Sequence, residues 1–292
     1  YIKHDLGHET LKCFEKMLGE GISPDIITYI CVLKACALVG SLEVGENIAV
    51  EVRKQGLLQK DLVLGATLVD MYAKCGALEK AREVFEKLPV QDVVSWNALS
   101  SRYDEHGFDE DVLQCLEHMQ LEGVMPDVLT YVCGLKACSS IGAVDKGIKI
   151  HNEIVNMGLI EKDIVLGNAL VDMYAKCGAL AKAHRILEEL PIRDVVSWST
   201  LIAGYAQHEQ GEDALKCFEQ MQTDGLFPNP ITFTYILKAC GSTGAMDKGK
   251  KIHEELMSQG LLENDVFLGT ALVDMYAKCG MLAKAHQVLG EL

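Results

Sequence analysis

Apolar residues recur at the spacing of an α-helix along the whole chain. Residues 68–75 carry them at intervals of three and four, which places them on one face of a helix. A second stripe over 78–88 repeats this spacing, and Pro89 closes it because the proline ring forbids continuation of the helix. Gly76, between the two stripes, is typical of a helix end. The pattern predicts pairs of short helices, and no strand-like alternation persists anywhere.

The whole pattern repeats along the chain with a period of 102 residues. The string LVDMYAKCG begins at residues 68, 170 and 272, and LKAC begins at 33, 135 and 237. Within each period, an acidic or amide residue precedes each helix pair and marks the start of a repeat. These boundary residues are Asp92, Asp127, Asp163, Asp194, Asn229 and Asp265. Consecutive repeats are therefore 35, 36 and 31 residues long, and three related types of repeat alternate.

A two-helix repeat of this size cannot bury both of its apolar stripes alone, so neighbouring repeats must stack. The sequence thus predicts an all-α solenoid of helix-turn-helix repeats, continuous over residues 1–292. The predicted repeats are 1–24 (partial, 35-residue type), 25–60, 61–91, 92–126, 127–162, 163–193, 194–228, 229–264 and 265–292 (partial, 31-residue type). The array is expected to be a segment of a longer one, whose exposed apolar ends could stack end to end between molecules.

Composition and charge exclude several classes of protein. With 49% hydrophobic and 24% charged residues, the chain is expected to fold rather than to remain disordered. No apolar run approaches the ~18 residues of a spanning helix, and no signal segment opens the chain. The net charge of -15 argues against general nucleic-acid binding through counterion release, so any such site must be local and structured. The eleven cysteines include no C-x-x-C pair, which favours a reducing compartment.

The alternation of 35-, 36- and 31-residue hairpins carrying DVVSWNAL, LKAC and LVDMYAKCG resembles the pentatricopeptide repeat family in its PLS subclass, whose repeat types are named P, L and S. The resemblance covers all 292 residues. The competing tetratricopeptide repeat has a constant period of about 34 residues and a W-x2-L-G-x2-Y signature, and neither feature is present. The resemblance implies a right-handed superhelix that binds single-stranded RNA, one base per repeat, with no cofactor.

The family reads each base with the fifth residue of a repeat, counted from just after the boundary residue, and with the boundary residue that ends the repeat. Two pairs carried over to this chain resemble the family's uracil pairs: Asn97 with Asp127, and Asn168 with Asp194. Ser199 with Asn229 resembles the adenine pair, and Thr234 with Asp265 resembles a guanine pair. Thr270 favours a purine without a boundary partner in this chain. Ile30, Val132 and Ala66 occupy the fifth position elsewhere and are expected to read weakly or not at all. The implied RNA core is 5′-U-x-U-A-(G)-(purine)-3′.

The family also places an apolar residue at the second position of each repeat, where it sandwiches the base. These residues are Val63, Val94, Val165, Val196 and Phe267, with Ile27, Leu129 and Ile231 in the 36-residue repeats. Judged without the resemblance, a β-branched residue near a helix start would be assigned to the core. Recurrent lysines on the first helices are candidate phosphate contacts, with solvated surface residues as the alternative: Lys74, Lys176 and Lys278, and also Lys34, Lys136 and Lys238.

The sequence contains little evidence for a catalytic or a metal-binding site. His151 and His253 each begin an H-x-E string, the first half of a zinc deaminase signature, but no P-C-x-x-C follows either one. Both histidines occupy the same place in successive 36-residue repeats, as a repeat consensus would produce. We therefore expect no metal site, no catalytic residue and no enzyme activity in this chain.

The resemblance implies the specificity segment of a plant organellar C-to-U RNA editing factor, located in the chloroplast or the mitochondrion. The deaminase-like domain of such factors is not present in this sequence. The competing function is a protein-interaction scaffold whose L repeats bind an editing cofactor protein. A scaffold alone would have no reason to vary Ala66, Asn168 and Thr270 within an otherwise nearly constant 31-residue repeat.

Overall fold

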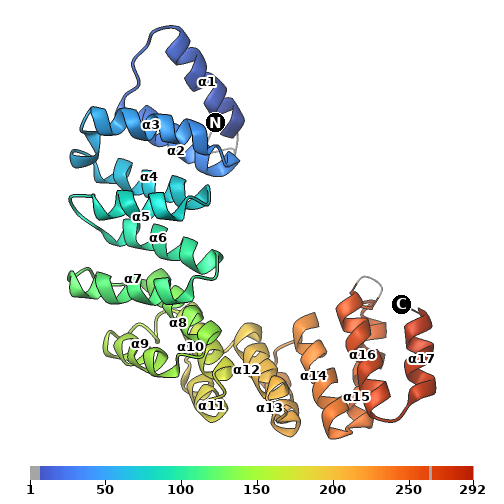
Figure 1. The fold of residues 1–292 in the computed structure, drawn as a ribbon. Helices are drawn as coiled ribbons and strands as arrows, with labels where there is room; N and C mark the ends of the chain where they lie inside the picture. The colour runs from blue at the N-terminus through green and yellow to red at the C-terminus, as the bar shows by residue number, and fades with distance from the viewer. Residues whose placement is uncertain (1–6, 263–264, 292) are drawn as a thin grey trace. The chain divides into compact units, whose positions relative to one another are not determined.

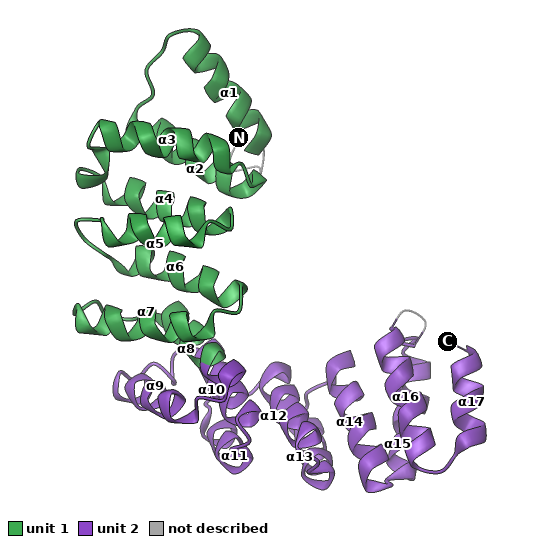
Figure 2. Cartoon of the chain, viewed as in Figure 1, with its two compact units in different colours: residues 1–137 green, residues 138–292 purple. Residues whose placement is uncertain are grey.

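The computed structural model describes residues 7–262 and 265–291, so parts of three predicted repeats (1–6, 263–264 and 292) lie outside the described residues. The chain divides into two compact units, residues 1–137 and 138–292 (Figure 2). Apart from one 3₁₀ turn, the elements in the described part of the chain are α-helices joined by short turns (Figure 1). The predicted all-α fold is confirmed. None of the described helices is both long enough and apolar enough to cross a membrane.

The helices follow one another as consecutive pairs. The first compact unit contains α1 (Gly7–Gly19), α2 (Ile26–Val39), α3 (Leu42–Lys54), the 3₁₀ turn Leu57–Gln59, α4 (Leu62–Lys74), α5 (Leu78–Glu86), α6 (Val93–Glu105) and α7 (Asp109–Leu121). The boundary between the units falls within α8 (Val128–Ile141). The second contains α9 (Val144–Asn156), α10 (Ile164–Lys176), α11 (Leu180–Glu189), α12 (Val195–Gln207), α13 (Gly211–Thr223), α14 (Pro230–Thr243), α15 (Met246–Ser258), α16 (Val266–Lys278) and α17 (Leu282–Glu291).

Within each compact unit the hairpins stack in two layers. The first helices of successive repeats contact one another in series: α2, α4 and α6 in one unit, and α10, α12, α14 and α16 in the other. Second helices pack against their own first helix and against the next first helix, as α5 does against α4 and α6 and as α13 does against α12 and α14. The stacking buries the two apolar stripes that a single repeat would leave exposed, which is the arrangement predicted for a solenoid.

The polar boundary residues act as N-caps of the first helices. The Asp61 Oδ1 atom accepts a hydrogen bond from the backbone N–H of Leu64 at 2.8 Å, and Asp92 Oδ1 accepts one from Ser95 at 2.9 Å. Such a cap contributes about 1 kcal/mol, because it satisfies a backbone donor that has no partner within the helix. At the other end of α4, Gly76 adopts a φ of 76°, which is the left-handed conformation expected where a helix stops.

Glycine allows the closest helix approach in the core. In every 36-residue repeat, the second helix meets the methionine of the LVDMYAKCG string in the next repeat. A Cβ atom added at Gly147 would lie 2.6 Å from Met173 Sδ, and the same contact would occur at Gly45 and Gly249. A larger residue would force these helices apart or displace the methionine side chain. The methionine of the LVDMYAKCG string thus fills the space beside the glycine at all three places.

All eleven cysteines are free thiols, and most are packed as small apolar residues. Burial raises the pKa of Cys36 and Cys217 to about 12, and that of Cys115, Cys138 and Cys240 to about 11.

A thiol-alkylating reagent at pH 8 is therefore expected to modify exposed Cys13 in the folded chain and to spare these five. Only about one part in a thousand of a thiol with a pKa of 11 is ionised at pH 8, and the thiolate is the reactive form. Mass spectrometry of alkylated peptides, before and after denaturation, measures this difference. Rapid alkylation of Cys217 or Cys36 in the folded chain would contradict the packing described above.

Candidate functional site

One face of each first helix remains open after the repeats have stacked. The helix α4 contacts α2, α3, α5 and α6, and these neighbours bury most of its circumference. Along its remaining face, Val63, Ala66, Asp70 and Lys74 follow one another at helical spacing; Val63 and Lys74 are exposed, Asp70 is half-buried and Ala66 is buried. We call this row, and the corresponding row on each of the other first helices, the open stripe. It contains the second and fifth positions that were predicted to contact a base, because those positions lie three residues apart.

The predicted sandwich residues are exposed rather than buried in the core. Their exposed fractions range from 48% at Leu129 to 85% at Phe267. The remaining members of the set are Ile27, Val63, Val94, Val165, Val196 and Ile231, and all lie within this range. A single exposed apolar side chain is ordinary, but its recurrence at one position of every repeat type forms a regular row of apolar contacts. The assignment to the core, which their residue type favours, is thus wrong for these positions.

Asn97 and Asp127 meet although they are 30 residues apart in sequence. The Asn97 Nδ2 atom donates to both carboxylate oxygens of Asp127, at 3.0 and 2.9 Å. Thr130 contributes a hydroxyl that donates to Asn97 Oδ1 at 2.7 Å, and a backbone N–H that donates to Asp127 Oδ1 at 3.0 Å. Partial burial would raise the pKa of Asp127, but hydrogen bonds from Thr130 and Asn97 outweigh burial and hold the pKa below its ordinary value. This carboxylate is therefore ionised at neutral pH and can only accept hydrogen bonds.

Ser199 and Asn229 form the corresponding group in the next 35-residue repeat. Here the boundary residue offers a hydrogen-bond donor, whereas Asp127 offers an acceptor. The Asn229 Oδ1 atom accepts from the backbone N–H of Thr232 at 2.8 Å and from the Thr232 hydroxyl at 2.9 Å. Because the oxygen is held inward, the amide NH₂ is left to donate. The Ser199 Oγ atom lies 2.6 Å from Thr232 Oγ1.

A cavity of about 280 Å³ opens beside this second group. Ser199 and Asn229 line it together with the exposed side chains of Val196 and Ile231, and Lys176 lies at the same cavity. A lining that combines two polar side chains with two apolar ones suits a flat heterocycle, whose edge needs hydrogen bonds and whose faces need apolar contact. The structure thus brings together residues that sequence spacing alone placed in two different repeats.

The remaining fifth residues are placed less uniformly. Asn168 Nδ2 donates to Asp194 Oδ1 at 3.3 Å, whereas Asn168 Oδ1 is buried and has no partner among the described residues. The Thr234 hydroxyl donates to the carbonyl of Pro230 in its own helix, and Asp265 caps α16 through the N–H of Leu268. Thr270 is exposed and its hydroxyl donates to the carbonyl of Val266, while Ala66 is buried and Ile30 and Val132 are half-buried.

Comparison with known proteins identifies the family. The chain matches the PPR repeat family over residues 193–242 and the pentatricopeptide repeat domain over 12–58. It also matches the PPR repeat over 67–93, 168–195, 231–261 and 270–292. The chain belongs to the pentatricopeptide repeat family.

Similar pentatricopeptide repeat proteins occur in Arabidopsis thaliana. One, named as chloroplastic, is 34% identical over 98% of this chain and 46% of its own length. Another is 35% identical over 99% of this chain and 51% of its own length, and one named as mitochondrial is 33% identical over 100% of this chain and 28% of its own length. The chain therefore spans about half, or less, of these relatives.

A solved pentatricopeptide repeat structure shares the fold. PPR10, in its crystal structure with an 18-nt psaJ RNA element, superposes with a TM-score of 0.80 over 98% of this chain and 42% of PPR10. At 20% sequence identity, this likeness supports the fold. The stacked hairpins described above are thus pentatricopeptide repeats.

All six recurrent lysines of these pentatricopeptide repeats are exposed, and four of them form ion pairs. Lys74, Lys176 and Lys278 each lie 2.7–2.9 Å from the aspartate four residues earlier, at Asp70, Asp172 and Asp274. Lys136 pairs with Asp104 at 2.7 Å. Exposed pairs of this kind are weak, about 0–1 kcal/mol, so a phosphate could compete with the aspartate for the ammonium group. Their predicted phosphate contacts remain a prediction.

Thr130 and Thr232 connect the two base-reading positions of each complete 35-residue repeat, and neither was predicted from the sequence to belong to the site. Thr130 is 3% exposed and Thr232 is fully buried. The recurrence of threonine is visible in the sequence, because Thr28, Thr130 and Thr232 lie 102 residues apart, each three positions after a boundary residue. The sequence does not show what this threonine does, because its side chain contacts a residue of the preceding repeat.

The H-x-E histidines have a packing role. His151 Nδ1 lies 3.0 Å from the Tyr174 hydroxyl, and His253 Nδ1 lies 2.9 Å from that of Tyr276. Burial, reinforced by a nearby lysine in each case, lowers the pKa of both imidazoles. Within the described residues, no group of three or more His, Cys, Asp or Glu side chains could hold a metal ion.

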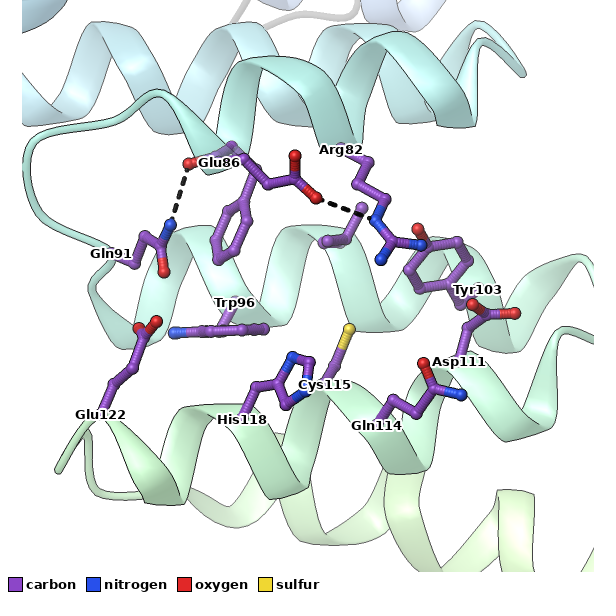
Figure 3. Close-up of a pocket in the computed structure, with 12 residues that line it drawn as sticks. Arg82, Glu86, Gln91, Trp96, Tyr103, Asp111, Gln114, Cys115, His118 and Glu122 are labelled. Carbon is purple, nitrogen blue, oxygen red and sulfur yellow. Dashed lines mark hydrogen bonds and ion pairs between the residues drawn. The ribbon is translucent and has the colours of Figure 1, made fainter.

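A separate cavity of about 140 Å³ lies between α5, α6 and α7 (Figure 3). Arg82 Nε donates to Glu86 at 3.1 Å, and Gln91 Nε2 donates to the carbonyl of Phe85 at 3.2 Å. Trp96 is buried at this cavity, and its Nε1 atom has no hydrogen-bond partner among the described residues. None of the predicted base-reading residues lines this cavity, so it is distinct from the open stripe.

Proposed function

We propose that this chain binds single-stranded RNA sequence-specifically and reads one base per repeat along the open stripes. The observation that supports this most strongly is the opposite hydrogen-bonding polarity of the boundary residues at the same place in two successive 35-residue repeats. Asp127 presents a carboxylate that only accepts, whereas Asn229 has its amide oxygen held by Thr232 and presents a donating NH₂ group. Helix capping alone would not require this difference, since Asp and Asn cap about equally well.

The two polarities match the edges of two different bases. Uracil carries an N3–H donor at the centre of its Watson–Crick edge, and an acceptor such as Asp127 suits it, whereas cytosine and adenine carry an acceptor nitrogen there. Adenine N1 accepts, so it suits the donating NH₂ of Asn229. The size of the fifth residue also affects which base fits. Ser199 is smaller than Asn97, and it lines a cavity of about 280 Å³ that has room for a purine. This reasoning supports uracil at the first site and adenine at the second.

The wider assignment extends the same proposal. The alternation of 35-, 36- and 31-residue repeats supports the PLS subclass, with the RNA core 5′-U-x-U-A-(G)-(purine)-3′. Relatives named as chloroplastic or mitochondrial support an organellar location. In this proposal the chain is the recognition segment of a C-to-U editing factor and catalyses no reaction itself.

Titration of the purified chain with short RNAs tests the proposal. At one fixed, stated salt concentration, an RNA with the U-x-U-A-G core is expected to bind at least about tenfold more tightly than the same RNA with U-x-U-U-G, since a well-made base contact discriminates by ~1–3 kcal/mol. A scrambled RNA of the same composition is the control. Equal binding of all three RNAs would contradict base reading.

A protein partner at the 36-residue repeats is the second candidate function. It is favoured by Ile30 and Val132, half-buried apolar residues that occupy the fifth position and cannot hydrogen-bond a base edge. If neither RNA binds even at low salt, the scaffold function becomes the better interpretation of the open stripes.

A further inference from the structure

The third residue after each boundary residue changes with the type of repeat that precedes it. It is threonine after the 35-residue repeats, serine after the 31-residue repeats and leucine after the 36-residue repeats. The three sets are Thr28, Thr130 and Thr232, then Ser95 and Ser197, then Leu64, Leu166 and Leu268. All three types can follow an N-cap, since the bond from the cap side chain needs only the backbone N–H of this residue. A serine or threonine hydroxyl adds a second bond by accepting from the boundary N–H, which completes a capping box. Capping therefore explains a hydroxyl at this position, but it does not explain why threonine follows one type of repeat and serine another.

Thr130 joins the fifth residue to the boundary residue through one hydroxyl. Its Oγ1 atom accepts from the backbone N–H of Asp127 at 3.2 Å, and it lies 2.7 Å from Asn97 Oδ1 and 2.9 Å from Asp127 Oδ1. The hydroxyl has a single proton, and the shorter of these two contacts is to Asn97. Because the Asn97 NH₂ group already faces the carboxylate, the threonine hydroxyl donates to the opposite end of the same amide. Both ends of the Asn97 amide are thus fixed.

Thr232 makes the same connection for a different pair. Its hydroxyl donates to Asn229 Oδ1 at 2.9 Å and lies 2.6 Å from Ser199 Oγ, so it lies between the two base-reading residues. If the Thr232 proton is used by Asn229, its oxygen can only accept from Ser199. That arrangement points the Ser199 proton at Thr232 and leaves a Ser199 lone pair facing the cavity.

The serine of the 31-residue repeats does not make this connection. Ser197 Oγ donates to the backbone carbonyl of Asp194 at 2.9 Å and accepts from its N–H at 2.9 Å. Asn168 is the fifth residue at this site, and its Oδ1 atom is left buried without a partner. The two Asn–Asp sites thus differ: Asn97 is held at both ends of its amide, whereas Asn168 is held at one end, by a single longer bond to its aspartate.

We infer that Thr130 and Thr232 are specificity-determining positioning residues, each of which fixes the hydrogen-bonding polarity of the base-reading pair in the preceding repeat. An asparagine amide rotated by half a turn exchanges its donor for its acceptor, and a hydroxyl can rotate between neighbours. When the amide and the hydroxyl are fixed, they cannot rotate to suit a base with the wrong edge. Binding of that base then loses the free energy of a hydrogen bond that is not made. This inference rests on the proposed RNA-binding function. It further implies that 35-residue repeats discriminate between bases more sharply than 31-residue repeats do.

Replacing Thr130 by Val removes the hydroxyl and keeps the shape of the side chain. The expected result is a fall of about three- to tenfold in the preference for uracil over cytosine at the base read by Asn97, because one net hydrogen bond is lost. Thr130→Ser keeps the hydroxyl and is expected to retain the preference. The measurement is the ratio of dissociation constants for two RNAs that differ only at this base.

Thr28→Val is the matched control. The Thr28 hydroxyl bonds its boundary residue Asp25 at 2.6 Å, as Thr130 does with Asp127, but the 292-residue chain contains no fifth residue for that repeat. This variant therefore reports what the hydroxyl contributes to folding alone, and it should leave base preference unchanged.

Thr232→Val and Thr232→Ser repeat the test independently at the Ser199 site. There the measurement compares RNAs that carry adenine or guanine at the base read by Ser199. These variants decide the question if Thr130→Val does not fold.

The outcomes separate this inference from the proposed function. If the unmodified chain prefers uracil and Thr130→Val keeps that preference undiminished, or weakens both RNAs equally, the positioning role is wrong while base reading stands. If the unmodified chain shows no preference between bases, the proposed function fails and this inference fails with it. A loss of preference that Thr130→Ser restores and Thr28→Val does not reproduce supports the positioning role.

Discussion

Adenine gives way to uracil as the preferred base when Ser199 is replaced by Asn and Asn229 by Asp in the same chain. This is the expected result, because the two substitutions convert the Ser199 site into a copy of the Asn97 and Asp127 site. The donating NH₂ of Asn229 becomes an accepting carboxylate, and the cavity beside Ser199 provides space for the larger asparagine. With ~1–3 kcal/mol for each well-made base contact, the ratio of affinities should shift by roughly ten- to a hundredfold in each direction.

The reciprocal change provides the control for this exchange. Asn97→Ser with Asp127→Asn should convert the first site from uracil to adenine, while the second site keeps its adenine. Helix stability should change little in both variants, since Asp and Asn are about equally good N-caps. Titration against RNAs that differ at one base measures the result. An unchanged order of preference in both double variants would show that these residues do not read the base.

A second large effect is expected from the core of the same repeat. Trp198 is 1% exposed, and its replacement by Ala should destabilise the region around α12 by about 3–5 kcal/mol, because the cavity left behind cannot collapse fully. In a stack of repeats, each repeat is stabilised mainly by its neighbours. The loss of stability should therefore be concentrated in α10 to α14. Amide hydrogen exchange followed along the chain measures this more directly than a single denaturation midpoint.

Val196 lies two residues away on the same helix and should behave in the opposite way. It is 54% exposed on the open stripe, so Val196→Ala should change stability by less than about 0.5 kcal/mol. RNA affinity should fall by up to about fifteenfold, since the two lost methyl groups would otherwise cover a base, at ~0.8 kcal/mol for each buried carbon. If Val196→Ala is the variant that destabilises the fold, the open stripe has been assigned to the wrong face.

Asp127 shows how one residue serves folding and recognition together. One of its carboxylate oxygens caps α8 through the N–H of Thr130, and both oxygens accept from Asn97. The cap holds the carboxylate in place, and the position of the carboxylate then determines the orientation of the Asn97 amide. A residue that is needed to start a helix is thereby presented to a ligand in a fixed geometry, without additional structure to hold it.

The sequence by itself determined the elements and their order. The helical spacing of apolar residues, the polar caps and the glycine and proline stops act within about one helical turn, so the chain displays them directly. Residues such as Asp92 and Gly76 therefore lie at helix ends as predicted. The period of 102 residues likewise predicted stacking, because isolated hairpins would leave apolar stripes exposed.

Tertiary structure alone decided which face of each first helix stays open and which side chains meet there. Those outcomes depend on contacts between residues about 30 positions apart, such as Asn97 with Asp127 and with Thr130, and no local pattern encodes their geometry. By residue type Val196 belongs in a core, yet the packing of neighbouring helices leaves it exposed. Local hydrogen bonds fix a helix, but only the positions of its neighbours determine which of its side chains remain free to bind.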